Sequence, residues 1–166
     1  MFMEKYKPWK YYKDIFDINY DYLINNSYNT LVFDIDNTII NNRTKNVSYK
    51  EIDLFKKLKD MGFKIIIVSN SWPWRVRRIS KSLGVKGLGL SFKPLIFNIL
   101  KAKRYLKTSY ENMVLIGDQL FTDVYAAYKT GIKSILVDPV DVYESFITIF
   151  NRGRENDIIN RGDYYE

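Results

Sequence analysis

Three aspartates stand where a folded chain could bring their carboxylates together. Asp34 and Asp36, two residues apart, follow the apolar run 30–33, and Asp118 follows a later apolar run, 113–116. Gathered carboxylates repel one another unless a divalent cation neutralises them, and an open site with only oxygen ligands is typical of Mg²⁺. The spacing therefore predicts a site in which Asp34, Asp36 and Asp118 hold Mg²⁺.

A lysine and a serine could complete this site. Ser69 follows the apolar run 63–68, and Lys93 precedes Pro94 at a predicted helix start. An ammonium group and a hydroxyl donor suit the oxygens of a phosphoryl group. With one carboxylate as nucleophile and another as acid and base, the set would be sufficient for phosphoryl transfer.

The composition excludes several other chemistries. The 166 residues include neither cysteine nor histidine, which rules out thiol nucleophiles, disulfides, Cys/His zinc sites and His-dependent triads. A hydrophobic share of 46% suits a globular protein, and no apolar stretch is long enough to span a membrane. The first residues lack the apolar core of a signal peptide, so we expect a cytoplasmic protein.

The charge is distributed unevenly along the chain. The net charge is +7, yet the span 61–110 holds eleven Lys or Arg residues and no Asp or Glu. An acid-free span of this length predicts an anionic partner on that side of the molecule. The alternative interpretation is that these basic residues only keep the surface soluble.

Strand and helix patterns alternate along the chain. Apolar runs at 30–35, 63–68, 113–116 and 134–137 predict buried strands. Helices are predicted from one capping box and three apolar stripes: Ser48 with Glu51, then Val76, Ile79 and Leu83, then Ile96, Ile99 and Leu100 after Lys93-Pro94, and last Val124, Ala127 and Tyr128. The alternation predicts a single α/β domain of the Rossmann type, with a central parallel sheet flanked by helices. Ligands bind such sheets beyond the carboxyl ends of the strands.

The chain divides into three parts. We predict an N-terminal arm at 1–28, a catalytic core at 30–138 and a C-terminal helix or tail at 139–166. The arm combines aromatic residues with lysines, a composition that fits either a membrane interface or packing onto the core. Packing is the favoured interpretation, because aspartates soon cancel the positive charge.

The ordered motifs resemble those of the haloacid-dehalogenase-like (HAD) phosphatase superfamily. The stretch DIDNT at 34–38 is similar to its first motif, Ser69 to the second, Lys93 to the third and GDQLFTD at 117–123 to the fourth. A lone Asp-x-Asp is a weak signal, but four motifs in order and in the right context are specific. A receiver domain, which also takes phosphate on an aspartate, fits less well, because the adjacent acids and the further Asp that it needs are missing.

The resemblance implies catalytic roles for four residues. Asp34 would attack phosphorus and carry the aspartyl-phosphate, while Asp36 would protonate the leaving oxygen and then activate water. Asp118 would hold Mg²⁺ together with Asp34 and the backbone carbonyl of Asp36. Lys93 would contact the transferring phosphoryl group.

The resemblance also implies supporting roles around these residues. Thr38, Ser69 and Asn70 are expected with Lys93 to bind the substrate phosphate, Thr38 also bracing its loop. Asp123 would act from behind the metal site, by orienting Lys93 or a metal-bound water.

More narrowly, the chain resembles the YqeG family of subclass IIIA, which is related to the phosphatidylglycerophosphatases. The words FDIDNTI, IVSN, IGDQLFTDV and ILVDPV carry this likeness. The spans 39–68 and 70–92 leave no room for a cap domain, so an open site is expected, suited to a phosphate on a large substrate. A lipid headgroup phosphate such as phosphatidylglycerophosphate is the preferred substrate. The alternatives are a nucleic-acid end, a small-molecule phosphate, or a non-catalytic anion-binding adaptor with this fold.

Two tryptophans lie next to the second motif. Trp72, Trp74 and Arg75 follow Ser69 in the stretch SNSWPWRVRR, where Pro73 suits the first turn of a helix. Without a cap to cover them, we expect these three side chains at the rim of the site. There they would dock an anionic, membrane-borne substrate, with peripheral contact to the inner face of the membrane.

Overall fold

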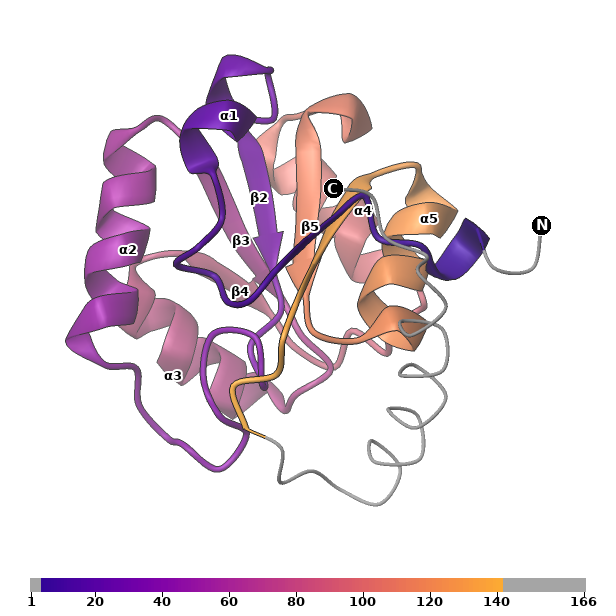
Figure 1. The fold of residues 1–166 in the computed structure, drawn as a ribbon. Helices are drawn as coiled ribbons and strands as arrows, with labels where there is room; N and C mark the ends of the chain where they lie inside the picture. The colour runs from indigo at the N-terminus through magenta and orange to yellow at the C-terminus, as the bar shows by residue number, and fades with distance from the viewer. Residues whose placement is uncertain (1–3, 142–166) are drawn as a thin grey trace.

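Six parallel strands form the central sheet of the computed structural model, which describes residues 4–141 (Figure 1). Their order across the sheet is β1-β6-β5-β2-β3-β4, and every neighbouring pair is parallel. The strands are β1 (Lys10–Tyr12), β2 (Thr30–Phe33), β3 (Lys64–Val68), β4 (Lys86–Leu88), β5 (Met113–Gly117) and β6 (Lys133–Val137). The predicted Rossmann-like α/β fold is confirmed.

Helices cover both faces of this sheet, as Figure 1 shows. One face carries α1 (Tyr20–Asn25), α2 (Tyr49–Asp60) and α3 (Pro73–Leu83), and the other carries α4 (Phe97–Leu106) and α5 (Tyr125–Thr130). Three short helical turns complete the fold: η1 (Glu4–Tyr6), η2 (Tyr110–Asn112) and the π-helical turn η3 (Leu120–Val124).

Alternate side chains of β2, β3 and β5 point into two separate cores. Leu31 and Phe33 of β2 pack in the same core as Phe55 of α2, with the Phe33 and Phe55 ring centroids 4.9 Å apart. Val32, between them, lies in the opposite core with residues of α4 and α5. Because both faces are covered, the inner strands are apolar at consecutive positions and show no period-two alternation.

Several local signals produce the predicted structure. The Ser48–Glu51 capping box is present at the start of α2. In α3, the predicted stripe of Val76, Ile79 and Leu83 is buried. Gly84 ends that helix in the left-handed conformation, which a residue without a Cβ adopts at little cost.

The structure differs from the prediction at the edges of the sheet. The outer strands β1 and β4 are only three residues long and have no apolar run, so their sequences did not predict strands. Helix α4 begins at Phe97, which leaves Lys93 in a turn before the helix and not at its start. Tyr128 of α5 is exposed, although it was expected on the buried stripe.

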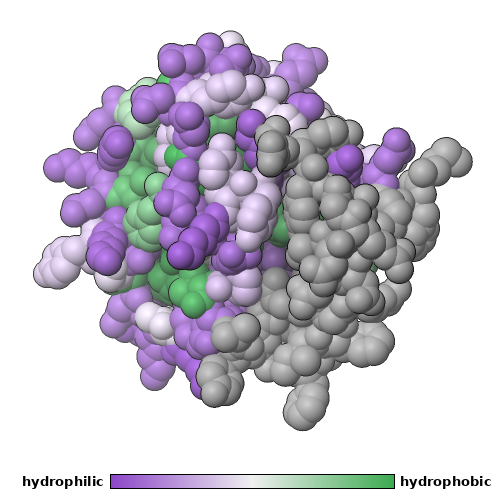
Figure 2. All heavy atoms as spheres, in the orientation of Figure 1, coloured by the Kyte–Doolittle hydropathy of each residue, from purple (hydrophilic) through white to green (hydrophobic). Residues whose placement is uncertain are grey.

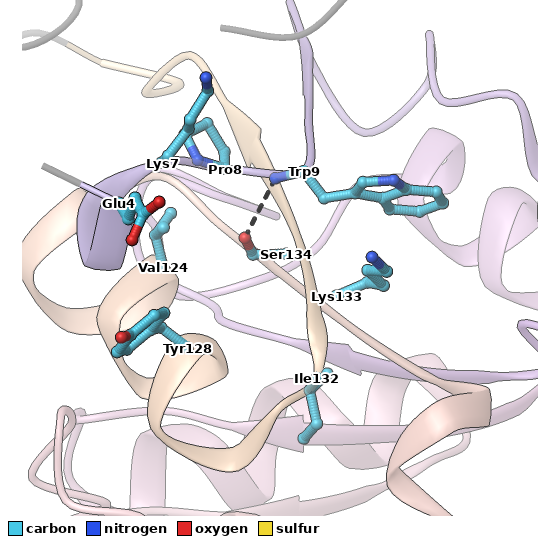
Figure 3. Close-up of a pocket in the computed structure, with 9 residues that line it drawn as sticks. All are labelled: Glu4, Lys7, Pro8, Trp9, Val124, Tyr128, Ile132, Lys133 and Ser134. Atoms are coloured by element: carbon cyan, nitrogen blue, oxygen red, sulfur yellow. Dashed lines mark hydrogen bonds between the residues drawn. The ribbon is translucent and has the colours of Figure 1, made fainter. Parts of the chain in front are cut away.

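The described part of the N-terminal arm packs onto the core. Strand β1 pairs with β6. The backbone N–H of Trp9 donates to the carbonyl oxygen of Ser134 at 2.9 Å and also to Oγ of Ser134 at 3.4 Å. Figure 3 shows the second of these bonds. The Tyr6 ring meets the ring of Phe121 at a centroid distance of 4.9 Å, and the Trp9 ring meets that of Tyr28 at 4.8 Å. These contacts agree with the packing interpretation of the arm.

Three observations concern the surface, the described helices and the C-terminal end of the chain. Figure 2 shows a largely hydrophilic face where the structure is described, with hydrophobic surface exposed beside α2. Among residues 4–141, no helix has the length and the apolar character that a membrane crossing requires. The predicted C-terminal helix or tail lies, beyond Asp141, outside the described residues.

Candidate active site

The carboxyl ends of the three central strands bring the predicted site residues to one edge of the sheet. Asp34 follows β2, Ser69 follows β3 and Asp118 follows β5, and β2 lies between the other two. The backbone N–H of Asp34 still donates to the carbonyl oxygen of Ile116 at 2.9 Å, so the ladder fixes the start of the loop that carries Asp34 and Asp36. The register of the sheet therefore sets how the side chains meet.

Lys93 lies at the centre of the site. Its Nζ is 2.8 Å from Oδ1 of Asp34 and 2.5 Å from Oδ1 of Asp123, and the whole residue is only 5% exposed. Burial by itself would lower the pKa of Lys93, but the charges of Asp123 and Asp34 outweigh it and raise the pKa above its usual range. Lys93 is therefore an ammonium ion throughout the physiological pH range.

Three buried carboxylates lie close together at this site, and two of them contact the ammonium group. One oxygen from each of Asp34, Asp118 and Asp123 lies within 4.8 Å of the others. Thr38 donates its hydroxyl to Oδ1 of Asp118 at 3.0 Å, which fixes that carboxylate. Carboxylates this close together repel one another when they are charged, and buried charge without compensation is costly. The donor set, oxygen only and in excess of negative charge, fits a divalent cation.

The hydrogen bonds of Asp123 link it to Lys93 and to the backbone after β5. Its Oδ1 accepts from Lys93, while its Oδ2 accepts from the backbone N–H of Gln119 at 3.2 Å. Burial raises the pKa of Asp123, with Lys93 acting against it and Asp34 adding to it. Asp123 thus contacts Lys93 directly, and its role in orienting Lys93 or a metal-bound water stays a prediction.

Gly117 allows Asp123 to reach this position. A Cβ built on Gly117 would lie 2.2 Å from Cγ of Asp123, inside the carboxylate. The absence of a side chain at Gly117 leaves space for an acid six positions further on. In the sequence, the only signal for this role was that Gly117 stands beside an aspartate at the end of a buried strand.

Ser69 and Asn70 organise the loop after β3. Ser69 is buried, and its Oγ accepts from the backbone N–H of Ser71 at 3.2 Å. Asn70 accepts from the N–H of Lys93 at 2.7 Å and donates to the carbonyl oxygen of the same residue at 3.3 Å. The amide of Asn70 thus holds the backbone of Lys93, and its contact with the substrate phosphate stays a prediction.

Asp36 lies outside the carboxylate cluster and is paired with Arg75. Nε and Nη2 of Arg75 donate to Oδ1 of Asp36 at 2.9 and 2.7 Å. Burial is the largest cause that raises the pKa of Asp36, and the charge of Asp34 adds to it, while Arg75 and a hydrogen bond with Ser71 act in the opposite direction. The net rise favours the protonated carboxyl that a general acid requires.

Arg75 was expected at an exposed rim, and this expectation is wrong. Only 8% of the residue is exposed, because the guanidinium group lies beneath the loop that follows β2. Helical periodicity placed Arg75 away from Val76 and the core, but it could not show that a loop covers that side of the helix.

The two tryptophans are exposed as expected, and further apolar side chains accompany them. Trp72 and Trp74 are each 63% exposed. Three further exposed apolar residues lie around the Lys93 turn and were not predicted from the sequence. The loop at 89–91 connects their segment to residues 69–73 through backbone contacts. We name the five residues the apolar rim: Trp72, Trp74, Phe92, Leu95 and Phe97. The only sequence signal for Phe92, Leu95 and Phe97 was that these apolar residues stand close to Lys93.

Solved structures share this fold. A protein of Vibrio cholerae, assigned as a 3-deoxy-D-manno-octulosonate 8-phosphate phosphatase, matches with a TM-score of 0.58 at 17% identity, over 86% of this chain and 77% of that one. A HAD family hydrolase of Deinococcus radiodurans, solved with phosphate and sodium, matches with a TM-score of 0.50 at 11% identity, over 80% of this chain and 98% of that one. The chain therefore belongs to the class of α/β proteins that have this fold.

Sequence comparison narrows this class to a family. The model of the family described as mitochondrial PGP phosphatase matches residues 3–141. The probable phosphatase YqeG of Bacillus subtilis is 34% identical over 160 residues, which cover 96% of this chain and 93% of the relative. The chain therefore belongs to the PGP phosphatase family and is a phosphomonoester hydrolase.

Proposed function

We propose that this phosphatase depends on Mg²⁺ and acts through an aspartyl-phosphate formed on Asp34. The observation that carries the proposal is the contact of Lys93 with both Asp34 and Asp123 beside the buried Asp118. In a chain without cysteine or histidine, this is the set of groups able to offer a nucleophile and to bind a phosphoryl dianion.

The first step transfers the phosphoryl group to the protein. A carboxylate oxygen of Asp34 forms a bond to phosphorus while the bond from phosphorus to the ester oxygen breaks. Asp36, in its protonated form, gives its proton to that oxygen, so that the product leaves as an alcohol. Lys93 stays charged and stabilises the negative oxygens of the group in transfer.

The second step regenerates the protein. Asp36, now a carboxylate, takes a proton from a water molecule whose oxygen attacks the phosphorus of the aspartyl-phosphate. The bond between phosphorus and Asp34 breaks, inorganic phosphate leaves, and the Asp34 carboxylate is restored. A divalent cation held by Asp34, Asp118 and the carbonyl of Asp36 would supply positive charge. That charge would let the Asp34 carboxylate approach the negatively charged phosphoryl group.

A phosphate on a lipid headgroup is the substrate that we favour. Within residues 34–93, the chain forms only α2, β3, α3 and β4 besides loops, so no inserted lid covers the site. The apolar rim lies at the same edge, and the span 61–110 is basic without any acid. Exposed aromatic residues together with positive charge suit the interface of an anionic membrane. The protein would act there as a peripheral protein, from the cytoplasmic side.

A comparison of substrates tests this function. We expect faster phosphate release from phosphatidylglycerophosphate in mixed micelles than from a 5′-phosphorylated oligonucleotide or a panel of small phosphate esters. Chelation with EDTA is expected to abolish the release, and added Mg²⁺ to restore it. Rapid turnover of another substrate with an inert lipid would overturn the lipid assignment, and full activity in EDTA would overturn the metal requirement.

A second prediction concerns membrane docking. The Trp72→Ala/Trp74→Ala variant should bind vesicles that contain phosphatidylglycerol about tenfold more weakly or worse, because each indole would lose apolar area buried at the interface. Turnover of a soluble aryl phosphate should change little. Vesicle sedimentation and phosphate release measure the two effects.

The control for docking is Tyr105→Ala, which removes an aromatic residue that is 59% exposed near the end of α4. That end lies at the opposite edge of the sheet, since Lys64 at the start of β3 donates to the carbonyl oxygen of Leu106. Equal losses in vesicle binding and aryl phosphate turnover for the tryptophan pair would instead assign both side chains to packing.

A further inference from the structure

We propose that Arg75 is a positioning residue that fixes the carboxyl group of Asp36 for proton transfer. The inference rests on the proposed function, because it takes Asp36 as the group that protonates the leaving oxygen. It assigns a catalytic task to a residue of α3 that belongs to none of the four motifs.

The contacts of Arg75 define a fixed geometry. Two of its nitrogens, Nε and Nη2, donate to the same carboxylate oxygen, Oδ1 of Asp36, at 2.9 and 2.7 Å. Two donors that converge on one oxygen fix the carboxyl group on one side and leave Oδ2 outside the pair. Arg75, together with the hydrogen bond from Ser71, therefore sets the orientation of the carboxyl group.

The same guanidinium group also holds the loop that carries Asp36. Nη1 donates to the carbonyl oxygen of Thr44 at 2.5 Å, and Nη2 donates to that of Asn41 at 3.1 Å. Arg75 thus joins the first turns of α3 to two points of the loop after β2 and to the acid within it. A planar group with five N–H donors can serve three acceptors at once, whereas a lysine ammonium cannot match this arrangement.

The place of Arg75 in its helix supports a functional reason for the residue. Arg75 lies in the first turn of α3, which contains no acidic residue, and a cation there opposes the helix dipole. It is also 8% exposed, whereas Arg77 and Arg78 of the same helix are exposed. A buried cation at an unfavourable helix position is a local cost that natural sequences retain mainly at functional sites.

The leaving group of the substrate distinguishes positioning from mere support. A p-nitrophenyl ester leaves as a stable anion and needs little protonation, whereas an alkyl ester needs the proton of Asp36. For Arg75→Lys and Arg75→Met we expect single-turnover release of the alcohol to fall roughly 10- to 100-fold, and release of p-nitrophenol to fall only a few fold. Substrate KM should change little for either ester, because Arg75 is not placed to touch the phosphate.

Two further variants make the test specific. Arg78→Met removes an exposed arginine of the same helix and should keep wild-type rates with both esters. Asp36→Asn removes the group on which Arg75 acts, so Arg75→Lys added to it should cause no further loss in alcohol release. Circular dichroism and thermal melting establish that each variant is folded.

The outcomes separate the two proposals. If the wild type releases no phosphate from any ester, the proposed function is wrong, and the role of Arg75 is wrong with it. If the wild type is active but the Arg75 variants lose rate equally with both esters, or lose it additively with Asp36→Asn, only the positioning role is overturned. Unfolding of both Arg75 variants would likewise overturn it, by assigning the residue to the fold.

Discussion

The Asp34→Asn variant is expected to lose turnover of an aryl phosphate by about 10⁴-fold or more, because an amide cannot form the bond to phosphorus. The protein should remain folded, and in metal-free buffer it should melt at a higher temperature. Three buried carboxylates lie close together, so removal of one negative charge relieves their repulsion and stabilises the fold by roughly 1 kcal/mol. Phosphate release and calorimetry measure the two effects.

Asp53→Asn is the matched control, since Asp53 is exposed on α2. Its activity and melting temperature should equal those of the wild type. Mass spectrometry after acid quenching should find a phosphate adduct on Asp34 of the wild type and none on the variant. Wild-type activity in Asp34→Asn would refute the aspartyl-phosphate mechanism.

The Lys93→Met variant is expected to lose both activity and stability. Without the ammonium group the phosphoryl oxygens lose a charged partner, which costs roughly 10²- to 10³-fold in kcat. Removal of one partner from a buried ion pair leaves the acids uncompensated, at a cost of about 3–5 kcal/mol in the free energy of unfolding. Activity assays and denaturant unfolding at pH 7 test these losses.

The stability loss should depend on pH in a defined direction. The pKa of Lys93 is raised in the folded state, so its stabilising contribution is complete at all pH values below the ordinary lysine range. The pKa of Asp123 is raised as well, and loss of Lys93 removes the main opposing charge. As the pH falls, protonation of Asp123 then relieves the variant, and the difference in unfolding free energy from the wild type should be smaller at pH 5 than at pH 8.

Lys129→Met serves as the control for Lys93→Met. Lys129 donates to the carbonyl oxygen of Pro94 at 2.9 Å, so it lies beside the same turn, but it is exposed and pairs with no acid of the cluster. Its removal should change neither activity nor the pH dependence of unfolding. A penalty for Lys93→Met that did not shrink between pH 8 and pH 5 would contradict the electrostatic explanation.

The central sheet could be predicted from the sequence because its strands are covered on both faces. Burial on both sides requires consecutive apolar residues, and the runs that contain β2, β3, β5 and β6 show this directly. The edge strands β1 and β4 could not be found in this way. Their three-residue sequences KYY and KGL become strands only because β6 and β3 offer free edges for pairing.

The site also contains some features that the sequence could predict and others that it could not. The positions of Asp34, Ser69 and Asp118 follow from strand ends, so a parallel sheet was enough to predict that they meet. The contacts of Lys93 with Asp123, of Asn70 with the Lys93 backbone and of Arg75 with Asp36 depend on loop conformations. No periodicity in the sequence encodes those conformations, which is why Arg75 was placed on the wrong side of the surface.

The pairing of β1 with β6 has a consequence for how the protein is made. Lys10 lies opposite Ile135 in this ladder, so the first strand of the described chain meets the last one. During synthesis from the N-terminus, the strand made first has no partner until the ribosome has added nearly all of the described residues. Its aromatic neighbours must wait as well, since Trp9 bonds to Ser134 and Tyr6 packs on Phe121 and Tyr125. Among the described residues, the arm is thus synthesised first and is among the last segments to reach its folded position.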